Sequence, residues 1–149
     1  MQIRFVLLWS KSIGPSKAFK SKSAGALFEE YIHRIKPFAN CETHYQLSEV
    51  KSGGYQLWLC DRMRNQKVIS SENLSEKLNQ TLLSGIKTLD VVIGGPDGVD
   101  ENWIQKNKPH FIWSFGPLTL PHELAAVVAS EQIYRAWSIL KNLPYHKGH

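Results

Sequence analysis

Short apolar runs alternate with amphipathic helical segments along this chain, and that alternation constrains its fold more than any other feature. The expected strands cover residues 3–9, 41–47, 55–60, 89–93 and 111–115. The expected helices cover residues 24–35, 70–83, 101–107 and 122–140. Such alternation favours a mostly parallel sheet with helices on both faces. The expected fold class is therefore α/β, with residues 1–149 forming a single domain large enough to bury a core.

The helix boundaries are marked by residues that favour helix ends. Ser70, Ser71 and Glu72 supply an N-cap and an acid for the first turn of the second helix. Asp100 can cap the short third helix, and Pro144 marks the exit from the last one. These signals fix where the loops between strands and helices begin.

Composition excludes several classes of protein. The hydrophobic content of 42% and the charged content of 21% are ordinary for a globular domain. The two cysteines, Cys41 and Cys60, are too few for a disulfide framework, so a reducing compartment is expected. The apolar run at the start is too short for a signal peptide or a membrane span. We therefore expect a cytoplasmic protein with no membrane partner.

The net charge of +5 is unevenly distributed. Residues 1–28 contain Arg4 and the lysines at 11, 17, 20 and 22 but no acid, and residues 132–149 also contain no acid. Basic chain ends favour a polyanionic partner such as RNA. The alternative is a solvated surface that only keeps the protein soluble, and charge alone does not decide between them.

Ligands of parallel α/β sheets bind at the carboxyl ends of the strands. Three segments of this sequence fall there: Cys60-Asp61, residues 94–98 and residues 115–121. The GGPDG segment at 94–98 follows a strand and precedes a capped helix, and its glycines permit positive φ and close approach of the backbone to a ligand. It is either a ligand-binding turn or a plain connection between a strand and a helix.

The segment SFGPLTLPHE, residues 114–123, is too apolar for an ordinary solvent-facing connector. It can surround an adenine ring with aliphatic side chains and bond the edge of the ring with backbone groups, or it can be tucked into the core. On the last helix, Glu131 and Arg135 have the i, i+4 spacing of a surface ion pair, and Arg135 is alternatively a phosphate ligand. Beyond the helix, Tyr145 and His146 form a short tail.

Motifs for other chemistries are missing from the sequence. It contains no GxSxG, HExxH or CxxC motif, and its six histidines have no metal-ligand spacing. We therefore expect no metal cofactor.

The segments singled out above resemble the RlmH family of SPOUT-class ribosomal RNA methyltransferases. The matching segments are residues 91–98, the SFGPLTLPH run at 114–122, and EQIYRAWSI and PYHK between 131 and 147. The Ser70-Ser71-Glu72 triplet, the first strand and the chain length also agree, so the resemblance spans nearly the whole chain. It implies an α/β fold with a C-terminal trefoil knot, a homodimer, and S-adenosylmethionine as methyl donor. The implied target is N3 of a pseudouridine in large-subunit rRNA of the assembled ribosome.

The resemblance also implies roles for individual residues. The cofactor positions of the family match Cys60, Gly94, Gly95, Phe115, Gly116, Pro117, Leu118, Thr119 and Leu120. The target-side positions match Arg135, Tyr145 and His146. We expect His146, or Tyr145 beside it, to accept or orient the N3 proton. Arg135 would stabilise negative charge on the base or hold a phosphate.

Two other functions fit the same residues. The first is a non-catalytic RNA-binding or ribosome-binding module of the same fold, which binding of S-adenosylmethionine would argue against. The second is a methyltransferase for another RNA or for a small molecule, which analysis of rRNA nucleosides separates from the implied function.

Overall fold

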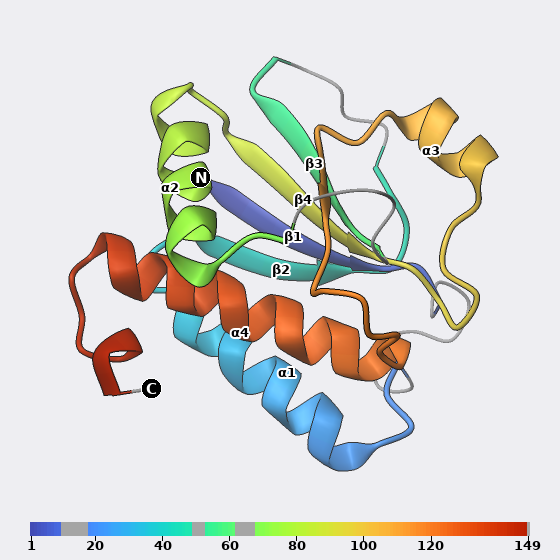
Figure 1. The fold of residues 1–149 in the computed structure, drawn as a ribbon, viewed down its shortest axis with the longest axis horizontal. Coiled ribbons are helices and arrows are strands. Elements are labelled where there is room, and N and C mark those ends of the chain that lie inside the picture. The colour runs from blue at the N-terminus through green and yellow to red at the C-terminus, as the bar shows by residue number, and fades with distance from the viewer. Residues whose placement is uncertain (10–17, 49–52, 62–67, 149) are drawn as a thin grey trace.

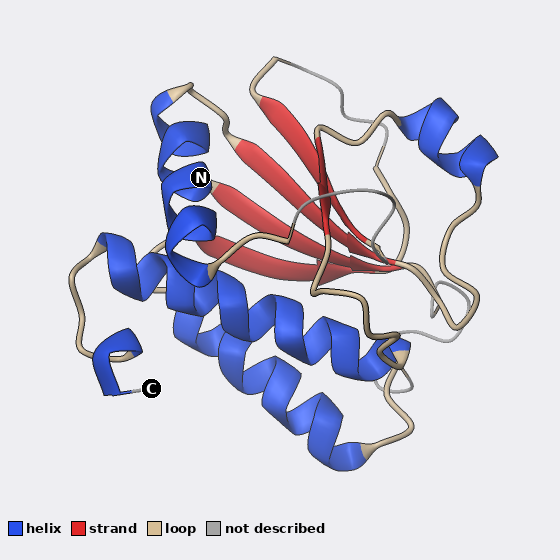
Figure 2. Cartoon of the chain, in the orientation of Figure 1, coloured by secondary structure: helices blue, strands red, loops and turns tan. Residues whose placement is uncertain are grey.

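A computed structural model describes residues 1–9, 18–48, 53–61 and 68–148 of the chain. The elements follow in the order β1 (Gln2–Leu7), α1 (Lys22–Ile35), β2 (Asn40–His44), β3 (Tyr55–Cys60), α2 (Ser71–Leu83), β4 (Thr88–Ile93), α3 (Glu101–Asn107), β5 (Phe111–Trp113), α4 (His122–Leu140) and the 3₁₀ turn η2 (His146–Gly148). Strands and helices thus alternate for most of the chain (Figures 1 and 2).

The five strands form one sheet in the order β2-β1-β4-β3-β5, and each neighbouring pair is parallel. The carboxyl ends of the strands therefore gather at one edge of the sheet, where the strand arrows converge in Figure 1. The expected parallel α/β class is confirmed. The knot that the resemblance implies stays a prediction.

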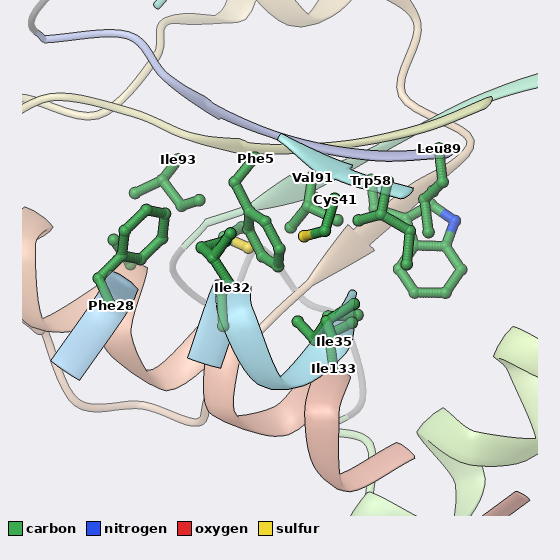
Figure 3. Packing of buried hydrophobic residues seen from close by; sticks show 14 of the residues in the cluster. Phe5, Phe28, Ile32, Ile35, Cys41, Trp58, Leu89, Val91, Ile93 and Ile133 are labelled. Carbon is green, nitrogen blue, oxygen red and sulfur yellow. The ribbon is translucent and has the colours of Figure 1, made fainter. Parts of the chain in front are cut away.

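Three long helices, α1, α2 and α4, share a buried core with one face of the sheet. Figure 3 shows Phe28, Ile32 and Ile35 of α1 and Ile133 of α4 directed at strand residues such as Phe5. The opposite face carries a smaller apolar cluster of Val6, Leu57, Leu59 and Val92, against which Trp103 and Ile104 of α3 pack. Helices on both faces were expected, and this arrangement confirms them.

The predicted caps form as hydrogen bonds. Oγ of Ser70 accepts from the backbone N–H of Asn73, and a carboxylate oxygen of Asp100 accepts from that of Trp103 at 2.8 Å. Each bond satisfies an amide that lacks a partner within the helix. The range predicted for α3 is therefore the one observed. The range predicted for α4 is also observed, although no side chain caps its start.

Some boundaries differ from the prediction. The expected strand at 41–47 ends at His44, and the expected strand at 111–115 ends at Trp113. The second difference has a local cause, because the hydroxyl of Ser114 bonds both the N–H and the carbonyl of Gly116 and turns the chain. Lys11 and Lys17 of the expected basic segment lie outside the described residues.

A buried ion pair joins two central strands. Nε of Arg4 donates to Oδ1 of Asp90 at 2.6 Å, a second guanidinium N–H donates to Oδ2 at 3.0 Å, and the Tyr55 hydroxyl donates to Oδ2 at 2.6 Å. Asp90 is fully buried. The strand register places Arg4 directly beside Asp90, so the charge in each strand is paired with an opposite charge in the neighbouring strand.

Within the described ranges, no helix is long and apolar enough to cross a bilayer.

Candidate active site

A cleft of about 470 Å³ opens at the carboxyl edge of the sheet. Its walls come from the segments that follow β3, β4 and β5, together with the start of α4. The lining residues are Cys60, Asp61, Ile93, Gly94, Gly95, Pro96, Asp97, Gly98, Val99, Phe115, Gly116, Leu118, Thr119, Leu120, His122 and Ala125. The three segments predicted to bind a ligand therefore meet in one cleft, because the carboxyl ends of parallel strands share an edge.

The glycine turn forms a wall of this cleft with bare backbone. The N–H of Gly98 donates to the carbonyl of Gly95 at 2.8 Å, which closes a tight turn, and Gly98 has a φ of +70°. A Cβ on Gly94 would lie 3.0 Å from the Cα of Gly98, which is tighter than most real Cβ contacts. A side chain at position 94 would therefore require the backbone of this turn to shift.

The facing wall is the apolar loop at 114–121. Buried Ser114 fixes the position of Gly116, which has a φ of +110°. Leu118 is 73% exposed although it is a large apolar side chain, and it stands at the mouth of the cleft. An apolar loop that presents an aliphatic side chain to an open cleft is suited to contact an aromatic ring of a ligand.

His122, which lines the cleft, is held by packing. The rings of Trp9 and His122 meet edge to face with centroids 4.6 Å apart, and the indole N–H of Trp9 donates to the carbonyl of Ala18 at 2.6 Å.

Burial, together with the charge of Asp61, raises the pKa of the Cys60 thiol. Cys60 therefore lines the cleft as a neutral thiol and does not act as a nucleophile.

A second group of predicted residues lies where the chain ends, between α2 and α4. Nε of Arg135 donates to Oε1 of Glu131 at 2.7 Å, which confirms the i, i+4 pair. Nη1 of the same guanidinium lies 3.0 Å from Nδ1 of His146, and Nε2 of His146 lies 2.8 Å from Oε1 of Glu72. The tail is thus clamped to α4 through Arg135 and to the first turn of α2 through Glu72.

Tyr145 lies in an aromatic group beside this clamp. Its ring meets that of Tyr134 edge to face at 4.7 Å, the guanidinium of Arg135 lies 4.9 Å from its centroid, and its hydroxyl is 3.5 Å from that of Tyr31. Burial, followed by the contact with Tyr31, raises the pKa of Tyr145. The phenol therefore stays protonated near neutral pH and can donate a hydrogen bond.

The predicted site residues thus form two groups and not one. The predicted cofactor positions line the cleft, except that Pro117 lies in the same loop without lining it. Arg135, Tyr145 and His146 are also brought together, but in the C-terminal half of α4 and the tail that follows it, whereas the cleft residue His122 begins this helix. Sequence reasoning did not anticipate Glu72 as a partner of His146. The Ser70-Ser71-Glu72 triplet was interpreted as a helix cap and as part of the family resemblance, and neither interpretation indicated a contact with His146.

Across the ranges that the structure describes, no three side chains of the His, Cys, Asp and Glu types gather into a candidate metal site.

Comparison with known proteins shows which family has these features. A family described as "Predicted SPOUT methyltransferase" matches residues 47–146. That segment contains β3, the whole cleft lining and the residues of the tail clamp.

Proteins named ribosomal RNA large subunit methyltransferase H are similar in sequence. The one from Psychrobacter arcticus is 36% identical over 147 residues, a match that covers 81% of this chain and 88% of the relative. The one from Saccharophagus degradans is 46% identical over 81 residues, covering 54% of this chain and 50% of the relative. Several relatives are therefore matched over about half of their length, whereas the first is matched over nearly all of it.

Two solved structures share the fold. A probable methyltransferase from Bordetella pertussis superposes with a TM-score of 0.57 at 15% identity, covering 90% of this chain and 95% of that one. A probable methylase family protein from Haemophilus influenzae gives a TM-score of 0.54 at 16% identity, covering 94% of this chain and 66% of that one. At such low identity the likeness concerns the fold alone.

Proposed function

Because the chain belongs to the SPOUT methyltransferase family, we propose that it methylates N3 of a pseudouridine in large-subunit rRNA, with S-adenosylmethionine as donor. The observation that carries the proposal is the convergence of the Cys60, 94–98 and 115–120 segments on one cleft. The relative from Psychrobacter arcticus, named for methylation of large-subunit rRNA, supports the substrate class.

The cleft suits the donor in size and chemistry. Its volume of about 470 Å³ lies in the range of small-molecule sites. The bare backbone of Gly94 and Gly95 offers close approach and amide groups, and the 115–120 loop offers apolar contact and backbone polar groups for an adenine. We propose that these two segments and Cys60 hold the donor, with Pro117 shaping the loop. Bound there, S-adenosylmethionine supplies a methyl group on a sulfonium, which is ready for direct displacement.

The contribution of the protein is to position the acceptor and take up its proton. Holding both reactants in line can lower the barrier by about 7–11 kcal/mol. Of the two tail residues considered as base, the raised pKa of Tyr145 favours His146. We assign proton acceptance to His146, and to Tyr145 a hydrogen bond or a stacking contact with the base. Arg135, whose side chain is 13% exposed, stabilises negative charge on the target.

A second copy of the chain supplies the tail in this proposal. His122 at the cleft and Arg135 at the clamp are separated by about 20 Å along α4. A methyl group passes between atoms about 3 Å apart, so cleft and tail of one copy do not share a target base. In a homodimer, the cleft of one copy and the tail of the other would form a composite site. A trefoil knot at the cofactor loops is part of the same family-based proposal.

The RNA surface in the proposal is basic. Backbone N–H groups of Lys20 and Ser21 donate to the Glu123 carboxylate on the first turn of α4, which brings exposed Lys20 and Lys22 near the cleft. Exposed Lys147 adds positive charge beside the tail. We propose that the protein binds ribosomes in the cytoplasm. Its affinity for ribosomes should fall as the salt concentration rises.

Methyl transfer to ribosomes tests the proposal. The purified protein is incubated with methyl-labelled S-adenosylmethionine and ribosomes from cells that lack the gene, and rRNA nucleosides are then analysed by mass spectrometry. The expected product is N3-methylpseudouridine in large-subunit rRNA. Label in another RNA would contradict the substrate, and donor binding without transfer to any RNA would contradict the catalytic role.

A further inference from the structure

Six polar side chains around the tail form a series of hydrogen bonds that the backbone of α2 closes into a ring. Beyond the Glu131–Arg135–His146–Glu72 contacts given above, the Ser71 hydroxyl donates to Oε1 of Gln132 at 2.6 Å, and Nε2 of Gln132 donates to Oε2 of Glu131 at 3.2 Å. Ser71 and Glu72 are neighbours on α2, so the ring closes. It joins the start of α2, the C-terminal half of α4 and the tail.

The ring fixes the tautomer of His146. A guanidinium can only donate, so Nδ1 of the imidazole, 3.0 Å from Nη1 of Arg135, must accept. The N–H proton of a neutral imidazole is then on Nε2, which donates to the Glu72 carboxylate at 2.8 Å. The hydrogen bond from His146 also lowers the pKa of Glu72, which therefore stays ionised at neutral pH.

We propose that Glu72 is a positioning residue that holds the Nε2–H of His146 and so makes Nδ1 the nitrogen that receives the pseudouridine proton. This inference rests on the proposed function and deepens it. Ser71 and Gln132 act one step further away, because they hold Glu131 and thereby the guanidinium of Arg135.

The step requires one exchange of partners. Arg135 leaves Nδ1 and turns to an oxygen of the target base, which frees the Nδ1 lone pair. The N3–H bond breaks and its proton forms the Nδ1–H bond, while the nitrogen electron pair forms the new bond to the methyl carbon. The carbon–sulfur bond breaks with its electrons on sulfur, which leaves a neutral thioether. Glu72 faces the resulting imidazolium through Nε2–H, and the proton later passes to water.

Three variants of the full-length protein separate position from charge. Glu72→Gln keeps an oxygen that accepts from Nε2–H but removes the charge, whereas Glu72→Ala removes both. Glu76→Gln, one turn further along the exposed side of α2, makes the same chemical change away from the ring. Each variant is first checked for an unchanged melting temperature and unchanged affinity for S-adenosylmethionine.

The first readout is the His146 tautomer, measured by long-range ¹H–¹⁵N NMR of the imidazole without donor or RNA. The proposal predicts the Nε2–H tautomer in the unmodified protein and in Glu76→Gln. Because Arg135 also favours this tautomer by donating to Nδ1, the effect of residue 72 is measured in an Arg135→Ala background. There the protein with Glu72, and with Glu72→Gln, should keep the Nε2–H tautomer, whereas Glu72→Ala should give a mixture of tautomers. An Nδ1–H tautomer in the unmodified protein, or the same tautomer in Arg135→Ala with and without Glu72→Ala, overturns the inference. Because this readout needs no activity, it stands even if the proposed function fails.

The second readout is the single-turnover methylation rate against pH. Glu72→Ala should lower the rate by about 10²-fold, as expected when an oriented base is lost. Glu72→Gln should show a smaller loss and move the acid limb of the profile to lower pH, because the imidazolium faces one negative charge fewer from α2 while Arg135, Glu131 and Tyr145 are unchanged. Profiles that coincide with that of Glu76→Gln overturn the inference. If the unmodified protein methylates nothing, only the proposed function fails.

Discussion

His122 and Arg135 lie on the same helix, α4, but they belong to different halves of the proposed site. His122 lines the cleft and packs against Trp9, whereas Arg135 contacts Glu131 and His146. About 20 Å of helix separates them, so the helix acts as a spacer between the proposed donor site and the proposed acceptor residues. This separation means that donor binding and methyl transfer can be impaired independently.

Substitution of Gly94 should block donor binding. In Gly94→Ala the added Cβ would lie 3.0 Å from the backbone of Gly98, so the turn that lines the cleft must shift. Calorimetry should show at least about a tenfold loss of affinity for S-adenosylmethionine. The matched control is Gly53→Ala, because a Cβ at Gly53 meets no atom within 4 Å. Equal affinities in the two variants would contradict the assignment of the cleft.

Substitution in the tail should leave donor binding unchanged. His146→Ala should lower the single-turnover rate by about 10²–10⁴-fold, the usual contribution of a positioned base, with an unchanged donor affinity. Tyr145→Phe should have a much smaller effect, because the raised pKa of Tyr145 already argues against its acting as base. If both variants methylate at the rate of the unmodified protein, the tail is not the proton acceptor.

The ion pair between β1 and β4 should dominate the stability of the sheet. Asp90→Ala leaves the guanidinium of Arg4 buried without its partner, and we expect a loss of about 3–5 kcal/mol in the free energy of unfolding. Tyr55→Phe removes one hydrogen bond to the same carboxylate and should cost about 1–2 kcal/mol. Urea-induced unfolding measures both losses. A change below about 1 kcal/mol for Asp90→Ala would show that the pair is not essential to the fold.

The two thiols should resist alkylation in the folded protein. Burial raises the pKa of Cys41 to about 12 from its ordinary value of 9.0, and burial also raises that of Cys60. The folded state thus keeps protons that the unfolded chain releases above pH 9, so this contribution is complete below pH 9 and is lost as the pH rises toward 12. Iodoacetamide at pH 8.5 should label both residues only in urea. Rapid native labelling of Cys60 that S-adenosylmethionine prevents would instead indicate a reactive thiolate.

Local signals in the sequence were enough to predict the helices and the loops of the cleft. The side chain of Asp100 caps α3 by accepting a hydrogen bond from the backbone N–H of Trp103. The start of α3 therefore depends only on residues that are close in the sequence. The cleft followed from a general rule, because the carboxyl ends of β3, β4 and β5 had to meet once the sheet was parallel.

Contacts between distant residues could not be predicted in this way. The order of the strands and the pairing of Arg4 with Asp90 depend on which strands become neighbours, and neither charge indicates its partner in the sequence. Likewise, Glu72 and His146 are 74 residues apart, and nothing local indicates that a helix cap and a chain end will meet. The sequence therefore predicted the residues of the tail as a group but not the clamp that holds them.

Mixing two inactive variants tests the composite site most directly. Gly94→Val is expected to lose the cleft but keep the tail, whereas His146→Ala keeps the cleft and loses the tail. If the cleft of one copy works with the tail of another, co-expression in equal amounts restores about a quarter of the unmodified methylation activity toward hypomethylated ribosomes, because half of the dimers are mixed and each has one intact site. A mixture that is as inactive as either variant alone contradicts the account.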